Sequence, residues 1–333
     1  MTPDKATRQD AFDLLQALAL GDLGTLAPDH RVAAVHPFGQ GDRDAAGAIW
    51  EALRAAMPDL ERRDDIFLMG QNRPDARLPG PRPTPLVATL GGYLGTFERP
   101  FLGIPPTGGV VCLPYGEAHH MAQGRITQSW LVWDIAGLMM QAGVWPLARP
   151  LGAPHFWPAP KGGQGVRLAP APEDGGQDSL SRVLDMHDAL HKFDGRSIDS
   201  MPMHHWAPDF MYWASAAIGA CRGVQGFRAH HQIPFLRAFP DRRGAGHFVR
   251  VSDGPFAVTG GDVAITHTGA PYLGLPATGK ALRLRVMDFY RFDAQGLIAE
   301  NWLPTDTLGL LDQMGVDVLA RMRHEVGAPD LVL

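Results

Sequence analysis

The sequence predicts an α+β protein made of two copies of one domain, and three observations support this fold class. An internal repeat covers most of both halves of the 333-residue chain. Within each copy, helical patterns come first and an antiparallel run of strands follows. A stretch rich in proline and glycine, Leu147–Ser179, separates the copies. We therefore expect a first domain over residues 1–146, a linker over 147–179 and a second domain over 180–333.

The repeat is clearest near the end of each copy. A Gln-Gly-x-Ile turn followed by Trp, Asp, Leu and Gln recurs at an offset of 172, so that Trp130 matches Trp302 and Asp134 matches Asp306. Further upstream the offset is 182, and we place the extra residues of the first copy in 73–85, which holds five prolines in thirteen residues. A period this long excludes a solenoid and indicates a duplicated domain.

The elements are expected in the same order in both copies. Apolar residues at helical spacing predict an opening helix in each, over Phe12–Ala19 and Val183–Phe193. A second helix is expected over 48–57 and over 226–239, where Pro234 should break it. In the second copy, alternating patterns and glycine turns predict five strands and a closing helix. These are His247–Val251, Phe256–Thr259, Asp262–Thr268, Leu282–Phe292 and Leu297–Leu303, followed by Thr307–Met314.

Composition narrows the class of function. Lysine and arginine total 30 against 35 acids, a net charge of −5, which argues against nucleic-acid and anionic-membrane partners. Two cysteines, Cys112 and Cys221, make neither a disulfide framework nor a zinc site, and should be reduced thiols. No apolar run reaches the roughly 18 residues of a membrane span, and the N-terminus lacks a signal-peptide core. We expect a cytoplasmic protein with a small-molecule ligand.

The motif Gly-[Ile/Leu]-Pro-x-Thr-Gly, a long strand, and then Gly-x-Ile-x₃-Trp-x₃-Asp-x₃-Leu-x₂-Gln-x-Gly occurs in both copies. It resembles the SnoaL-like polyketide cyclases of the nuclear transport factor two-like superfamily, over about residues 8–146 and 180–323. The resemblance implies two cone-shaped α+β barrels, each a curved, mostly antiparallel sheet wrapped around helices, with a deep apolar pocket. It also implies an intrachain pseudo-dimer paired through the sheets, with further homo-oligomerisation left open. Such cyclases use an acidic residue without metal or cofactor, so no cofactor is expected.

The strand 282–292 is the most informative stretch. Period two places Val286, Asp288 and Tyr290 on one face, which is apolar except for the carboxyl. Burial of a carboxyl raises its pKa toward the range that a general base needs near neutral pH. Pairing of Asp288 with an arginine is the equally weighted alternative. At an offset of 172, Asp288 matches Gly116, so the sequence predicts a degenerate pocket in the first copy.

Other candidate residues lie in the second copy. The family motif points to Asp306 as an acid, although Asp306 and Asp134 each precede a helix and are also explained as N-caps. His267 and Tyr290 are candidate proton donors to a substrate oxygen, and a satisfied core histidine is the alternative for His267. Candidate pocket-lining residues, for which core packing is the alternative, are His247, Trp213, Tyr212, Trp206, His231, Phe235 and Trp302.

No metal site is predicted. His187 and His191 have the i, i+4 spacing of a zinc motif, but no third ligand is indicated. A solvated helix face explains this pair better.

These patterns together predict an enzyme with cofactor-independent acid/base chemistry on a small apolar carbonyl compound. Aldol cyclisation, isomerisation and hydration all fit, which makes it a polyketide cyclase-like isomerase or lyase. Asp288 or Asp306 would take the proton, and His267 or Tyr290 would donate to the oxygen. The alternative is a non-catalytic small-molecule-binding or scaffold module of the same fold.

Overall fold

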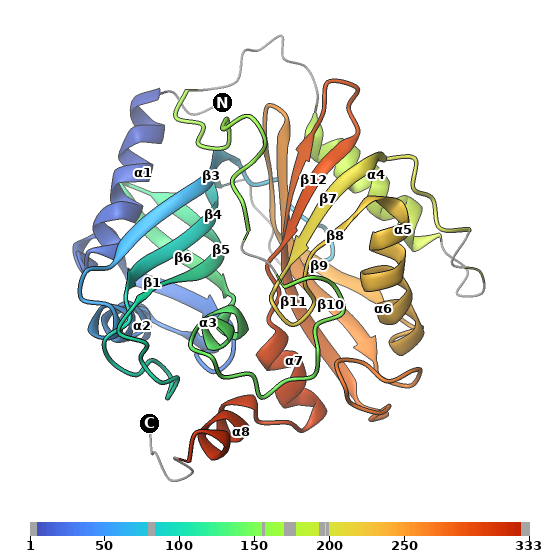
Figure 1. The fold of residues 1–333 in the computed structure, drawn as a ribbon. Coiled ribbons are helices and arrows are strands. Elements are labelled where there is room, and N and C mark those ends of the chain that lie inside the picture. Colours follow the sequence, from blue (N-terminus) through green and yellow to red (C-terminus); the bar gives the residue numbers. More distant parts are fainter. Residues whose placement is uncertain are drawn as a thin grey trace.

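The chain forms two six-stranded sheets that lie face to face, with most helices on their outer sides (Figure 1). This computed structural model describes residues 5–78, 84–154, 157–169, 178–192, 197 and 200–327. Phe193 and residues 79–83 of the expected insertion lie outside these ranges. The strand orders are β2-β1-β6-β5-β4-β3 and β8-β7-β12-β11-β10-β9. The second order repeats the first with each strand number raised by six, so the predicted duplication and the α+β class are confirmed.

The first domain contains six strands, three α-helices and one 3-10 turn. In chain order they are α1 (Lys5–Ala19), η1 (Leu23–Thr25), β1 (Leu26–Ala34), β2 (Gln40–Gly41), α2 (Arg43–Ala56), β3 (Glu61–Gln71), β4 (Pro85–Thr96), β5 (Val110–Ala122), β6 (Arg125–Trp133) and α3 (Ile135–Gln141).

The second domain repeats this series and adds a helix at its end. Its elements are α4 (Ser179–His191), β7 (Trp206–Ala214), β8 (Cys221–Arg222), α5 (Gly223–Phe227), the π-turn η4 (Arg228–Gln232), α6 (Ile233–Ala238), β9 (Arg243–Asp253), β10 (Phe256–Thr266), β11 (Ala281–Phe292), β12 (Ile298–Leu303), α7 (Thr307–Met314) and α8 (Val318–Glu325).

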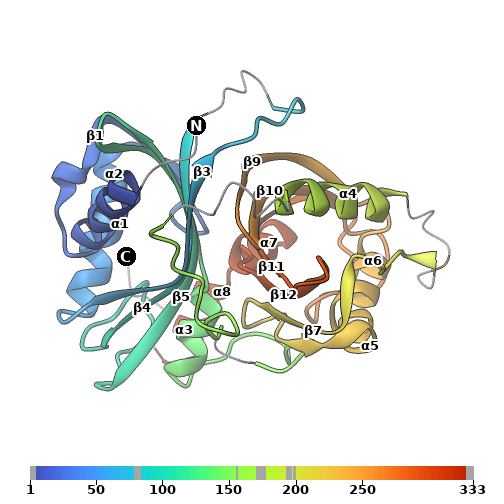
Figure 2. The same cartoon turned by 90° about the horizontal axis from the view of Figure 1, so that it is seen from above.

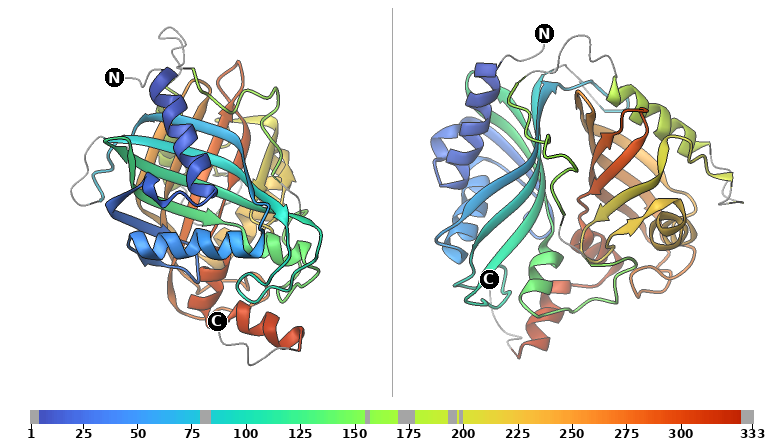
Figure 3. Two further views of the ribbon diagram at one scale, coloured as in Figure 1. Left: turned by 90° about the vertical axis from the view of Figure 1, so that its left-hand side faces the viewer. Right: turned by 45° about the horizontal axis from the view of Figure 1, so that its top comes forward.

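Each sheet is mixed rather than fully antiparallel. The β1–β6 and β7–β12 pairs are parallel and the other pairs are antiparallel. Helices α1 and α2 lie across the first sheet (Figure 3), and α2 buries Ile49, Trp50 and Leu53 on one face. No helix in the described ranges is both long and apolar enough to cross a bilayer.

Two expected breaks in the second copy are absent. The strands expected at 256–259 and 262–268 form one strand, β10, because Gly260 and Gly261 stay in the ladder with β11. The helix also continues past Pro234. Its preceding turn widens, and the N–H of Ile233 donates to the carbonyl of Arg228, five residues back. A π-turn of this kind accommodates local irregularity without ending a helix.

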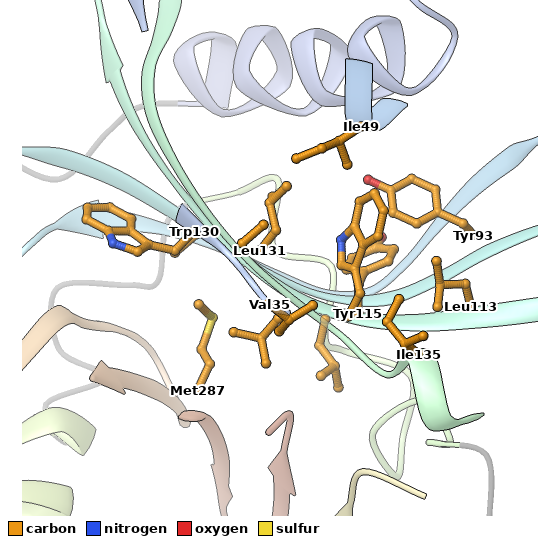
Figure 4. Packing of buried hydrophobic residues seen from close by; sticks show 14 of the residues in the cluster. Val35, Ile49, Tyr93, Leu113, Tyr115, Trp130, Leu131, Ile135 and Met287 are labelled. Carbon is orange, nitrogen blue, oxygen red and sulfur yellow. The ribbon is translucent and has the colours of Figure 1, made fainter. Parts of the chain in front are cut away.

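The two domains share one apolar core between their sheets. Met287 and Phe289 of β11 belong to the same buried cluster as the first domain's core, and Met287 lies on the opposite side of the first sheet from Ile49 (Figure 4). Gly116 has no side chain because a Cβ there would lie 2.5 Å from Cγ of Pro304. The first sheet is therefore shaped to receive the second.

The described part of the expected linker packs against both domains. Trp157 donates its indole N–H to the carbonyl of Ala214, and Trp302 donates to Pro158. On the other side, Val166 forms a β-bridge with Phe67. Sequence reasoning treated this stretch as a flexible linker, because proline and glycine hide its tertiary contacts, whereas the structure shows it packed across the sheets.

Candidate functional site

Asp288 lies on the inner face of the second sheet, which packs against helix α4. Tyr290 and Phe292 on the same face belong to the apolar core inside the second domain. Met287 and Phe289, the strand neighbours of Asp288, point to the other face and belong to the core shared with the first domain. Asp288 is thus a carboxyl on an otherwise apolar inner face.

No arginine or lysine pairs with Asp288 in the described part of the chain. Asn301 donates to its carboxyl, with 3.2 Å between Nδ2 and Oδ1, and the Tyr290 hydroxyl also hydrogen-bonds it. Burial raises the pKa of Asp288 to about 7, and these two hydrogen bonds offset only part of the rise. The side chain still keeps some exposed surface. A carboxyl that is ionised in part near neutral pH and is not fully covered has the properties of a general base.

Helix α4 adds His187, which sequence reasoning assigned to a solvated helix face. Its Nε2 lies 3.2 Å from the Tyr290 hydroxyl. Burial lowers the pKa of His187 well below its usual value, and nearby cationic groups lower it further, so the ring is neutral. The available signal was its position four residues after buried Val183, which places both on one helix face.

His247, an expected pocket residue, lies on β9 beside this group. Its ring centroid is 5.3 Å from that of His187. Burial lowers the pKa of His247 to about 4, and Arg250 and Arg77 add to the effect. The structure therefore brings His247, His187, Tyr290 and Asp288 into one row of contacts.

Aromatic residues line the same interior. Trp206 and Tyr212 belong to the inner core, and the Trp206 ring lies 6.4 Å from the Tyr290 ring. The Tyr212 hydroxyl is 2.9 Å from Nδ1 of His231, whose pKa burial lowers to about 3. Phe235 stacks on His231 at 6.0 Å. These four expected residues lie on the inner side.

Trp213 and Trp302 do not line the interior. Because neighbours on a strand point to opposite faces, an inward Tyr212 places Trp213 outside. The two indoles stack on each other at 5.0 Å, and Trp302 donates to the carbonyl of Pro158 in the linker. They belong to the shared core between the sheets.

Asp306 lies at the domain interface and not with Asp288. It caps α7 by accepting from the N–H of Gly309 at 2.9 Å, and it accepts from the N–H of His36 in the first domain. Burial raises its pKa. These backbone partners explain why both copies of the repeat carry an aspartate here. Asp306 is an N-cap, as the alternative interpretation expected.

His267 is also separate from Asp288. Thr266, the residue before it, pairs with Ala281, whereas Asp288 pairs with Thr259, seven residues away along β10. At about 3.3 Å per residue this is roughly 23 Å. His267 is completely buried, its Nε2 lies 3.1 Å from the carbonyl of Ala270, and its ring packs on Phe239. His267 is therefore a buried core histidine but not a fully satisfied one, since its Nδ1 has no hydrogen-bond partner among the described residues.

The first domain keeps an acid at the position of Asp288. Trp130 and Trp302 match in the repeat, and they pair with Ala118 and Phe289 respectively. The residues before these are Glu117 and Asp288, and each pairs with a threonine, Thr89 or Thr259. The expected match of Asp288 with Gly116 is therefore wrong by one residue, which on a strand exchanges the two faces.

Glu117 is ion-paired with Arg62, which it shares with Asp64. Arg62 of β3 donates to it at 2.7 Å, and Trp133 and Tyr93 donate at 2.7 and 2.9 Å. His119 lies 3.2 Å away. Burial alone would raise the pKa of Glu117, but Arg62 and His119 together outweigh burial and the pKa falls to about 2. All five side chains are buried, so this acid is part of a closed network.

The arginine has no counterpart in the second domain. Arg62 pairs with Tyr93, four residues after Thr89 on β4, and Gly244 pairs with Val263, four residues after Thr259 on β10. Gly244 thus occupies the position of Arg62. The same sheet position carries a neutralised acid in one copy and an unpaired acid in the other.

The described residues contain no group of three or more histidine, cysteine or acidic side chains placed to hold a metal ion. The pair of His187 and His191 is not directed at one point, since His187 contacts Tyr290 while His191 is exposed.

Residues 183–314 match the family model of SnoaL-like polyketide cyclases. The second domain is therefore the part of the chain that is similar in sequence to SnoaL-like polyketide cyclases. The match runs from the opening helix to the closing helix of that domain, and it includes every residue of the row from His187 to Asp288.

Each of the solved structures similar to this chain matches a length of about one domain. IdmH from Streptomyces antibioticus is 23% identical, covers 41% of this chain and 99% of its own, and has a TM-score of 0.34. TsrD from Streptomyces laurentii is 24% identical, covering 42% and 96%, with a TM-score of 0.33. An NTF2-like protein from Burkholderia thailandensis is 20% identical, covering 41% and 98%, with a TM-score of 0.34. No curated protein matches the sequence significantly.

Proposed function

We propose that the second domain is an enzyme that moves a proton at the carbon next to a carbonyl group of a small apolar compound. The contrast between Glu117 and Asp288 carries this proposal. Both acids occupy the same sheet position, but Arg62 neutralises Glu117 while Asp288 has a pKa of about 7. Strongly shifted acids inside an apolar domain are typical of catalytic groups.

Asp288 is the proposed base and Tyr290 the proposed oxygen partner. The carboxylate takes the proton from the α-carbon, and the electron pair of the C–H bond moves to the carbonyl oxygen as an enolate. The Tyr290 hydroxyl accepts from Nε2–H of His187 and, turned from Asp288 to the substrate, donates its single proton to that oxygen. Protonation at another carbon completes an isomerisation. Attack of the enolate carbon on a second carbonyl, with the proton returned to the new alkoxide, completes an aldol cyclisation.

The interior favours an apolar substrate. Trp206, Tyr212 and Phe292 form its core with Tyr290. His187, His231 and His247 are all neutral because burial lowers the pKa of each. A neutral, aromatic interior strengthens hydrogen bonds to a developing enolate and gives little attraction for a charged substrate.

Proton abstraction can be tested before the physiological substrate is known. The protein is incubated in D₂O with a panel of small aryl and cyclic ketones, and deuterium incorporation at the α-carbon is followed by NMR. Asp288→Asn keeps the shape and should reduce the enzyme-dependent exchange about 10²–10⁴-fold. Asp306→Asn is the matched control and should retain exchange. A panel that binds but shows equal exchange in wild type and Asp288→Asn would contradict the proposal and favour a binding module.

A further inference from the structure

A segment of the first domain lies along the second domain's edge strand. Residues 72–78, which follow β3, extend toward β9 (Figure 2). Asn72 donates to the carbonyl of Phe248 at 2.9 Å and accepts from the N–H of Arg250 at 2.8 Å. The N–H of Arg73 donates to the carbonyl of Arg250 at 2.8 Å. An edge strand that would otherwise expose its backbone is thereby covered.

The segment has no counterpart in the other copy. In the second domain only two residues, Gly254 and Pro255, join β9 to β10. The described start of the expected insertion, residues 73–78, is therefore one of the elements by which the first domain contacts the second.

Asp75 is the centre of this contact. It is 4% exposed, and it accepts from the backbone N–H of His247 at 2.7 Å. Its carboxylate lies 2.8 Å from an Arg250 nitrogen and 2.7 Å from an Arg77 nitrogen. Arg250 also donates through Nε to Nδ1 of His247 at 3.2 Å. The Asp75 carboxylate at 2.8 Å and the Pro74 carbonyl at 3.3 Å thus hold the arginine next to the row of site residues.

Without Asp75, Arg250 would be able to reach Asp288. Arg250 pairs with Thr259, and Thr259 pairs with Asp288, so the three residues form one line across β9, β10 and β11. Two strand spacings are about 10 Å. In the first domain, Arg62 crosses the same two spacings to reach Glu117 at 2.7 Å.

We infer that the first domain is a working part of the second domain's site, and that Asp75 is a positioning residue that holds Arg250 away from Asp288. The inference rests on the proposed function only for the role of Asp288 as a base. The other titratable and charged groups on the elements packed here are His187, Asp188 and His191 of α4, His247 of β9, Tyr290 of β11, Tyr212 of β7, and Arg73 and Arg77 of the docked segment.

The test measures the titration of the Asp288 carboxyl by NMR on protein labelled with ¹³C at the aspartate carboxyls, with Asp288→Asn used for assignment. In Asp75→Asn, Arg250 is released and pairs with Asp288, so the titration midpoint should fall by about one to three pH units. In Asp75→Asn/Arg250→Gln the midpoint should return close to that of wild type. A purely structural role of Asp75 would not produce this rescue.

Two further variants keep the inference falsifiable. Asp178→Asn removes the exposed ion pair of Arg73 with α4, at 2.7 Å, but leaves Arg250 held, and should not move the midpoint. Arg250→Gln alone should also leave the titration midpoint of Asp288 unchanged. This variant tests the inference even if Asp75→Asn does not fold. A raised midpoint in Arg250→Gln, an unchanged midpoint in folded Asp75→Asn, or failure of the rescue would overturn the inference. Because no substrate is used, this result is independent of the ketone-exchange test.

Discussion

Asp134 and Asp306 make the same bond across the domain interface in opposite directions. Asp134 caps α3 through the N–H of Gly137 and accepts from the N–H of Ala216 at 2.8 Å in the second domain. Asp306 caps α7 and accepts from the N–H of His36 in the first. His36 lies two residues after the end of β1, and Ala216 lies two residues after the end of β7, the equivalent strand of the second domain. The pseudo-two-fold relation of the sheets is therefore built from the repeated motif itself.

Asp134→Asn should lower stability by about 1–3 kcal/mol, because Gly137 and Ala216 donate to different oxygens of Asp134 and an amide retains only one accepting oxygen. The loss should be smaller in Asp306→Asn, since one oxygen, Oδ1, accepts from both Gly309 and His36 and an amide keeps this acceptor. Differential scanning calorimetry would measure it. Ketone exchange should be unchanged in both, and a loss of exchange in folded Asp306→Asn would return this residue to the catalytic group.

The pH dependence of exchange should report Asp288. Since the base acts only when ionised, and burial raises its pKa to about 7, exchange at low ketone concentration should rise with pH and level off above about pH 8. The measurement is the initial rate of deuterium incorporation between pH 5 and 9. A plateau that already begins near pH 5 would mean that the acting base has an ordinary carboxyl pKa and is a different residue.

The sequence was sufficient for the domain plan because the repeat supplies its own alignment. The match of Trp130 with Trp302 makes β6 and β12 equivalent strands, and the other strands of the two sheets correspond in the same order. The match failed across the preceding turn. There the second copy has one residue more than the first. The constant offset therefore matched Asp288 with Gly116 and not with Glu117, and a shift of one residue on a strand assigns each residue to the wrong face.

Contacts between residues far apart in the sequence leave no local pattern. His187 was placed in solvent because its partner Tyr290 is 103 residues away. Asp75, within a proline-rich insertion, contacts Arg250, 175 positions later. Asp306 was weighed as catalytic because its backbone partner, His36, lies in the other copy. Periodicity predicts which face a residue takes, but not which residue of the partner domain meets it.

Asp288→Asn should change how stability depends on pH. The pKa of Asp288 is raised from 3.8 to about 7, so the native state binds more protons than the unfolded chain between these values. Wild-type stability therefore loses a contribution as pH rises from about 4 to 7, at up to about 1.4 kcal/mol per pH unit. The uncharged amide lacks this loss. Urea unfolding at pH 4.5 and 7.5 should show the variant gaining on wild type at the higher pH. A constant difference between the two proteins would argue against a raised pKa.

Glu117→Gln should show the opposite dependence. The pKa of Glu117 is lowered from 4.5 to about 2, so its contribution is present above about pH 4.5 and is lost as pH falls toward 2. Because Arg62 keeps its ion pair with Asp64, removing the Glu117 charge should cost about 1–3 kcal/mol at pH 7. Acid unfolding monitored by circular dichroism would show the gap to wild type narrowing below pH 4. Exchange should be retained at a temperature where the variant is folded, and its loss would assign chemistry to the first domain as well.

Gly244→Arg should convert the second domain's acid into the neutralised state of the first. A Cβ at this position lies 2.9 Å from a terminal nitrogen of Arg77, which is the end of a flexible side chain and is able to move aside. The introduced guanidinium then starts from the position of Arg62, which reaches Glu117 at 2.7 Å. We expect the titration midpoint of Asp288 to fall by about one to three pH units. Gly244→Met, of similar length and without charge, controls for bulk and should leave the midpoint near 7. Exchange should fall in the arginine variant at neutral pH, because a carboxylate held by a guanidinium is a weaker base. An arginine variant that folds and keeps both the midpoint and the exchange rate would show that the absence of this arginine is not what distinguishes the two copies.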